Sequence, residues 1–118
     1  MLEWSHEQQG AILEALGRFP RASNKCARLA RALLPIATAL DADARALLVE
    51  PSGFALYVQP KGGPARWMHH VTTSVQAHCV DVLTGVAGHP EGTYLEAYFE
   101  HPTAHLIRPV EDDDWEEL

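Results

Sequence analysis

Cys26 has the surroundings of a nucleophile. It follows Ser23 and Asn24, two residue types that favour the N-cap position of a helix. Its sulfur is therefore expected beside the free N–H groups and the positive end of the helix that begins there, with Lys25 and Arg28 as basic neighbours. Each feature favours the thiolate, which is the form that attacks a carbonyl carbon. The alternative is a small buried hydrophobe, as free cysteines often are.

His70 and Asp81 are spaced to activate such a nucleophile. Residues 67–75 alternate as a strand does, which puts His70 on the more polar face, at the wet edge of a cleft. Asp81 follows after a tight turn at 76–78. If the two segments pair as a hairpin, Asp81 returns beside His70 and orients its ring by accepting a hydrogen bond. The sequence therefore predicts a triad with Cys26.

Other interpretations of these residues stay open. His70 also fits a solvent-facing strand histidine, and Asp81 fits an acid that caps the turn at Thr84. His69 replaces His70 as the base if the strand register shifts by one residue.

Possible metal ligands cluster between residues 69 and 89. They are His69, His70, His78, Cys79 and His89. Zinc binds three or four such side chains, but His69 and His70 face opposite sides of one strand and none of the common zinc spacings occurs. We therefore expect no metal and no cofactor, and we expect both cysteines, Cys26 and Cys79, to be reduced.

The first part of the chain is expected to be helical, because its apolar residues recur at helical spacing. The predicted elements are a helix over 6–17 with a Ser5–Gln8 capping box, a second helix from Cys26 that kinks or restarts at Pro35, and a short turn through Leu47 capped by Asp41 or Asp43.

From residue 48 onward the period of the apolar residues changes to 2, which is typical of strands. The predicted elements are strands at 54–59, 67–75 and 79–83, a short helix at 91–100 and an edge strand at 105–109. N-terminal helices followed by an antiparallel sheet form the α+β class.

Charge is unevenly distributed along the chain. The net charge is −7, but six of the 16 acidic residues lie within the last eight positions. Residues 15–40 hold five basic side chains and no acid. We expect one domain over 1–109, a mobile acidic tail over 110–118, and an acidic partner docked on the basic stretch Arg18–Arg31.

Composition excludes several classes of protein. At 47% apolar and 21% charged residues the chain has the composition of a folded globular domain. No apolar run reaches the ~18–20 residues that span a bilayer. The N-terminus lacks the pattern of a signal peptide, so export is expected only through a partner or a larger parent chain. The arginines follow helical spacing without a glycine-rich loop, which favours a solvated helix face over a nucleic-acid site.

Three segments within residues 20–100 resemble the papain-fold toxin 2 family of bacterial polymorphic toxins: NKCARLARAL, RWMHHVTTSVQAHCVDVLTG and YLEAYF. In that family a cysteine opens the first core helix, a His-Val strand follows, and an aspartate comes at a similar spacing. The resemblance implies a papain-like fold with Cys26 as nucleophile, His70 as general base and Asp81 as the residue that orients it. Asn24 and the backbone N–H of Cys26 are the candidate oxyanion donors.

The resemblance also implies a biological role. Such domains end long secreted proteins, enter a neighbouring cell and are neutralised in the producer by an immunity protein. The expected partners are therefore a target-cell protein substrate, a cognate immunity protein and a larger parent chain, without a membrane or a nucleic acid.

Several reactions are compatible with a Cys–His–Asp site. Peptide hydrolysis, deamidation of Gln or Asn, and transglutamination all pass through one acyl-thioester. The small size of the domain favours a deamidase or a narrow protease. Two other classes stay open: a non-enzymatic partner-binding or immunity-type module, and a nucleotide-acting toxin.

Overall fold

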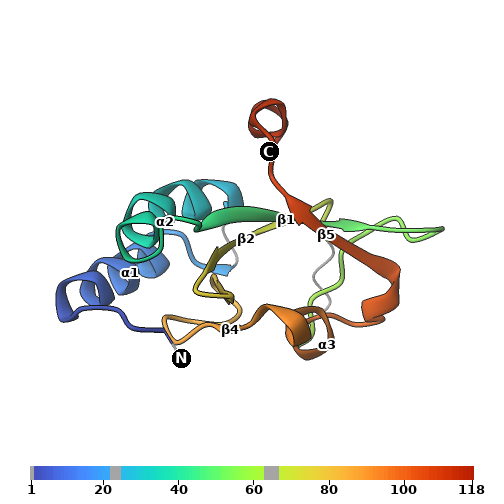
Figure 1. The fold of residues 1–118 in the computed structure, drawn as a ribbon. Coiled ribbons are helices and arrows are strands. Elements are labelled where there is room, and N and C mark those ends of the chain that lie inside the picture. Colours follow the sequence, from blue (N-terminus) through green and yellow to red (C-terminus); the bar gives the residue numbers. More distant parts are fainter. Residues whose placement is uncertain (1, 22–24, 63–66) are drawn as a thin grey trace.

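Two N-terminal helices and a five-stranded antiparallel sheet form the fold, which confirms the α+β class (Figure 1). The structure, a computed structural model, describes residues 2–21, 25–62 and 67–118. The helices are α1 (His6–Arg18), α2 (Cys26–Leu40) and the short α3 (Tyr94–Tyr98). The strands are β1 (Arg45–Pro51), β2 (His70–Val75), β3 (His78–Val80), β4 (His89–Pro90) and β5 (His105–Pro109), in the order β4-β3-β2-β1-β5.

The capping box predicted for α1 is present. The Ser5 hydroxyl accepts from the Gln8 N–H at 3.0 Å, and the Gln8 side chain accepts from the Ser5 N–H at 2.9 Å. These two bonds satisfy N–H groups that a helix start leaves free. The helix then buries Ile12 and Ala15 against α2.

Helix α2 begins at Cys26, as the sequence predicts, but its cap differs from the prediction. The N-cap residue is Lys25, whose side chain makes no capping hydrogen bond. Ser23 and Asn24, the predicted caps, lie outside the described residues. Cys26 therefore occupies the first helical position.

The sequence predicts a kink or a restart at Pro35, and the restart is wrong, because α2 runs unbroken to Leu40. Pro35 lacks an N–H and so leaves the Arg31 carbonyl without its helical donor. Both residues are exposed, so water can satisfy that carbonyl, while Leu33 and Ala37 hold the opposite side of the helix in the core.

The predictions around β1 were also wrong. The expected helical turn through Leu47 is instead the strand Arg45–Pro51, which pairs with both β2 and β5. A strand covered on both faces reads as a continuous apolar run, which periodicity does not separate from a buried helix. Among the described residues, the expected strand at 54–59 makes only one isolated bridge, between Val58 and Trp67, and its Phe54 side chain is fully exposed.

The predicted hairpin joins β2 to β3. Its turn residues Gln76 and Ala77 both have positive φ, 48° and 59°, as a type I′ turn requires. The Asp41 carboxylate accepts the Gln76 N–H at 2.7 Å and so holds this turn against the end of α2. Asp41 thus caps a hairpin and not the helical turn that the sequence suggested.

The two faces of β2 carry different layers. Helix α2 lies on one side of the sheet and α3 on the other (Figure 1). Val71 and Val75 pack with α2, whereas the His70 ring lies beside that of Phe99, which in turn contacts Tyr94 of α3. This alternation was predicted, but the expected wet position of His70 was wrong, because its exposed fraction is 0%. The second layer, which the strand pattern did not indicate, covers the imidazole.

The acidic tail, whose composition predicts a mobile segment, lies against the body of the domain. The Asp114 carboxylate accepts two hydrogen bonds from the Arg108 guanidinium, at 2.8 and 3.1 Å. The Trp115 ring lies 4.8 Å from the Arg31 guanidinium. Trp115 and Leu118 both pack against the core cluster that contains Ala30, Leu48 and Val71. The tail therefore carries apolar anchors among its acids.

Candidate active site

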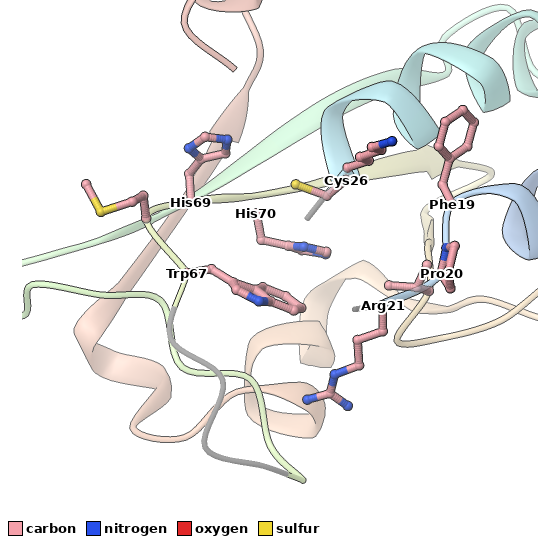
Figure 2. Close-up of a pocket in the computed structure, with 10 residues that line it drawn as sticks. Phe19, Pro20, Arg21, Cys26, Trp67, His69 and His70 are labelled. Atoms are coloured by element: carbon pink, nitrogen blue, oxygen red, sulfur yellow. The ribbon is translucent and has the colours of Figure 1, made fainter. Parts of the chain in front are cut away.

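Cys26 lies at the N-terminus of α2 with its sulfur over the His70 ring (Figure 2). Burial alone would raise the pKa of the Cys26 thiol, but the adjacent His70, the backbone N–H of Val71 and that of Ala27 together lower it below its ordinary value. The free N–H groups at the start of α2 act in the same direction. The surroundings therefore shift the ionisation of Cys26 toward the thiolate.

His70 is held between Cys26 and an aromatic wall. Its ring stacks on Trp67 with centroids 5.0 Å apart and lies 5.9 Å from the ring of Phe99. Burial alone would lower the pKa of His70, but Asp81 and then Cys26 raise it to about 9. The imidazolium is therefore the favoured form of His70 at neutral pH, and it lies next to a thiol whose pKa is lowered.

The two ring nitrogens of His70 have different surroundings. Nε2 lies 3.1 Å from Oδ2 of Asp81. Nδ1 is buried and has no hydrogen-bond partner among the described residues. Because Nε2 faces Asp81, Nδ1 is the ring nitrogen available for proton exchange with Cys26, whose proximity raises the pKa of His70.

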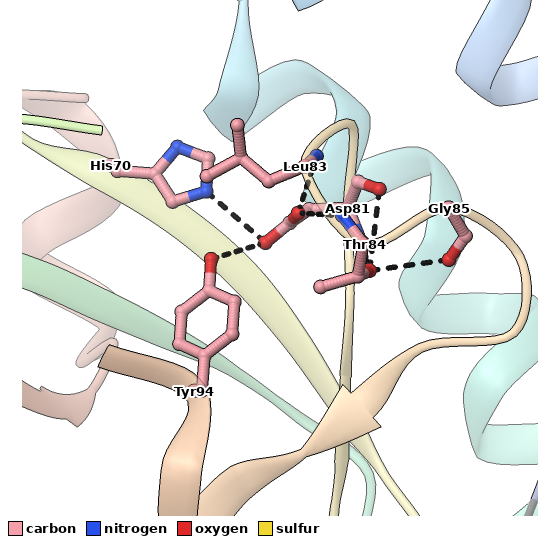
Figure 3. A network of polar contacts seen from close by, with 6 residues as sticks. All are labelled: His70, Asp81, Leu83, Thr84, Gly85 and Tyr94. Carbon is pink, nitrogen blue, oxygen red and sulfur yellow. Dashed lines mark hydrogen bonds and ion pairs between the residues drawn. The ribbon is translucent and has the colours of Figure 1, made fainter. Parts of the chain in front are cut away.

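Asp81 lies directly after β3, and both of its carboxylate oxygens are bonded (Figure 3). Oδ1 accepts the N–H groups of Leu83 and Thr84 at 2.8 and 3.2 Å, and Oδ2 faces His70 and the Tyr94 hydroxyl. Burial raises the pKa of Asp81, but the bond to His70 and its charge, followed by the nearby Thr72 and Tyr94 hydroxyls, lower it below its ordinary value. The turn-capping role and the orienting role considered for Asp81 thus coexist.

Tyr94 is the site residue that sequence reasoning missed. Its buried hydroxyl donates to Oδ2 of Asp81 at 2.5 Å. Burial and the charge of Asp81 raise the pKa of Tyr94 well above its usual range, so it stays a donor at neutral pH. Only the fold of the 3₁₀ turn Glu91–Thr93 and α3 back onto β3 brings this residue to the triad.

Replacing Tyr94 with phenylalanine should lower the free energy of unfolding by about 1.5–3 kcal/mol, because a buried hydrogen bond to a charged group is lost. Urea denaturation measures this difference. Tyr98→Phe is the matched control on the same helix, since the Tyr98 hydroxyl makes no hydrogen bond to a described residue. Equal losses in the two variants would argue against a role for the Tyr94–Asp81 bond.

A pocket of about 220 Å³ opens beside Cys26. Its aromatic wall is formed by Phe19 and Trp67, and its basic side chains are Arg21 and Lys25. The Arg21 guanidinium lies over the Trp67 ring at 5.9 Å and donates to the Lys61 carbonyl at 2.8 Å. Among the described residues no carboxylate lines this pocket, and none forms an ion pair with Arg21 or Lys25.

The remaining predicted site residues are placed differently. His69 lines the same pocket, but its ring points away from the His70–Trp67 stack (Figure 2) and Asp81 is bonded to His70. Burial and then the charge of His70 lower the pKa of His69. Asn24, the oxyanion candidate, lies outside the described residues. The Cys26 N–H is one of the N–H groups that a helix start leaves without an intrahelical partner.

Within the described ranges, no group of three or more His, Cys, Asp or Glu side chains is arranged to hold a metal ion. Both cysteines are free thiols. No helix in the described part of the chain has the length and apolar content needed to cross a membrane.

Comparisons of the chain with protein-family models, with curated proteins and with solved structures find no match.

Proposed function

We propose that this chain is a papain-like cysteine amidase that forms an acyl-thioester on Cys26. The observation that carries the proposal is the buried His70–Asp81 pair, with Nε2 and Oδ2 3.1 Å apart, beside a thiol whose pKa is lowered. A structural histidine in an apolar layer would lose its charge on burial. The raised pKa of His70 is instead what a thiolate–imidazolium pair needs.

The proposed reaction has two halves. The Cys26 thiolate attacks the amide carbon and a C–S bond forms, while the backbone N–H of Cys26 stabilises the oxyanion. His70 gives its proton to the leaving amine as the C–N bond breaks. Water then attacks the thioester, His70 takes one proton from it, and the C–S bond breaks to release a carboxylic acid and the thiolate.

The biological part of the proposal is that the domain acts as a toxin in competition between bacteria. Its support is the resemblance of three segments to the papain-fold toxin 2 family. The expected partners are a protein substrate in the target cell and an immunity protein in the producer. Expression in a susceptible bacterium, with loss of viability as the readout, tests this role.

Iodoacetamide should alkylate Cys26 much faster than Cys79 at pH 6–7. Thiolates react and thiols do not, and the pKa of Cys26 is lowered while burial and nearby carboxylates raise the pKa of Cys79 to about 12. Labelling followed by mass spectrometry at each cysteine measures the two rates. Equal rates, or a slower Cys26, would remove the activated nucleophile and with it the proposed function.

A further inference from the structure

We propose that the amide which reaches Cys26 is the side-chain carboxamide of a glutamine flanked by acidic residues, so that the reaction is deamidation. This inference rests on the proposed function and names its substrate class.

The pocket has room for a side chain and not for an extended peptide. Its volume of about 220 Å³ is below the roughly 300–1,000 Å³ of pockets that enclose a whole small molecule. The Trp67 side chain forms one wall of the pocket. Its ring stacks on the His70 ring, and the Arg21 guanidinium lies over it. A partly aromatic pocket of this volume suits the methylene stem of a glutamine, with its carboxamide at the sulfur.

The two sides of the site carry opposite charge. Met68 and His69 line both this pocket and a neighbouring cavity. The neighbouring cavity is lined by three carboxylates, those of Glu50, Asp114 and Glu117, and by the Arg108 guanidinium.

Arg108 already binds two of those carboxylates, on Glu50 and Asp114, whereas Arg21 and Lys25 have no carboxylate partner among the described residues. Acidic residues that flank the substrate glutamine are therefore attracted to Arg21 and Lys25, and they are repelled by the carboxylates of the neighbouring cavity. Such attraction acts over the ~8–10 Å screening length of physiological salt.

The proposed step balances as the hydrolysis of a primary amide. The thiolate forms a C–S bond to the glutamine carboxamide carbon, the C–N bond breaks, and ammonia leaves with the proton that His70 supplies. Water hydrolyses the thioester, which leaves a glutamate in the target and restores the thiolate and imidazolium.

Three peptide probes test the substrate class without knowledge of the natural target. Two carry a central glutamine whose amide nitrogen is replaced by a chloromethyl group, one flanked by glutamates and one by lysines. The third keeps the glutamate flanks but carries the chloromethyl ketone at the end of its backbone. The readout is the second-order rate of Cys26 alkylation, measured by mass spectrometry and divided by the iodoacetamide rate of the same variant.

We expect the glutamate-flanked side-chain probe to react at least tenfold faster than either of the others. Lys25→Glu and Arg21→Glu should each reduce the ratio of glutamate-flanked to lysine-flanked rates by about fivefold, the scale of one partly exposed charge pair. Arg45→Glu is the control with the same charge change, because Arg45 pairs with Ser74, four strand positions from the Val49–His70 pair.

The outcomes separate the inference from the proposed function. A faster reaction of the backbone probe would overturn deamidation in favour of proteolysis. Equal alkylation rates for the glutamate-flanked and lysine-flanked probes would overturn the proposed preference for acidic flanks. The same conclusion would follow if Arg45→Glu reduced the ratio of these two rates as much as Lys25→Glu does. Failure of the proposed function itself is a different result, namely iodoacetamide labelling of Cys26 that is no faster than that of Cys79.

Discussion

Cys26→Ala is expected to abolish amide turnover and toxicity while leaving the fold intact. In the proposed mechanism the thiolate forms the covalent intermediate, and loss of the nucleophile in a comparable hydrolase costs on the order of 10⁶ in kcat. Cys26 is only partly buried at the first position of α2, so the loss of one sulfur atom should change the free energy of unfolding by less than about 1 kcal/mol. Turnover, viability of the expressing bacterium and urea denaturation measure the three effects.

Cys79→Ala is the matched control for this prediction. Cys79 is fully buried on β3 in the same core cluster as Tyr94 and Phe99, so its loss leaves a cavity. We expect a loss of about 1–3 kcal/mol in the free energy of unfolding and unchanged labelling of Cys26. A Cys26→Ala variant as toxic as the parent would exclude the cysteine mechanism, whatever the behaviour of Cys79→Ala.

Asp81→Asn is expected to give the second-largest loss, about 10²–10⁴ in kcat/KM. The reason lies in the donors that surround the carboxylate. Oδ1 accepts two backbone N–H groups and Oδ2 faces His70 and the Tyr94 hydroxyl. An asparagine that keeps its oxygen toward the backbone turns its NH₂ toward His70 Nε2. Nε2 of the neutral ring then accepts a hydrogen bond from this NH₂, so the ring proton is on Nδ1. Nδ1 faces Cys26 and, once protonated, cannot take the proton of the Cys26 thiol.

The pH dependence of Cys26 alkylation distinguishes this positioning role from a loss of fold. Without the Asp81 charge the raised pKa of His70 falls, and a neutral ring no longer stabilises the thiolate, so the pKa of Cys26 rises. The labelling profile of Asp81→Asn should therefore move to higher pH. An unchanged profile would contradict the role of Asp81.

Asp41→Asn is the control for Asp81→Asn, because Asp41 also accepts two backbone N–H groups at a turn. It lies at the far end of α2 from Cys26. We expect Asp41→Asn to leave the pH profile of Cys26 alkylation unchanged.

Asp81→Asn should also reduce stability. Breaking the buried His70–Asp81 pair is expected to lower the free energy of unfolding by about 3–5 kcal/mol, which urea denaturation measures.

Local patterns predicted much of this protein. The capping box of α1, the start of α2 at Cys26 and the tight β2–β3 turn depend on neighbours within a few residues, so they can be read along the chain. The same holds for the hairpin that returns Asp81 to His70, because a short turn constrains the register of the strands that follow it.

The tertiary structure decided which side chains those patterns would bury and what would bond them. The sequence predicts a helical turn where strand β1 lies, because the continuous apolar run of β1 arises from burial on both faces. Residues of α2 cover one face, and Tyr94 and Phe99, far along the chain, cover the other. The strand pattern predicts a solvent-exposed His70, yet its ring packs against Trp67 and Phe99, two residues that lie outside the β2–β3 hairpin. Tyr94 meets Asp81 only because the chain folds back after β4. Sequence spacing carries no signal for contacts of this kind, since burial and hydrogen bonding between distant segments are set by how whole layers pack.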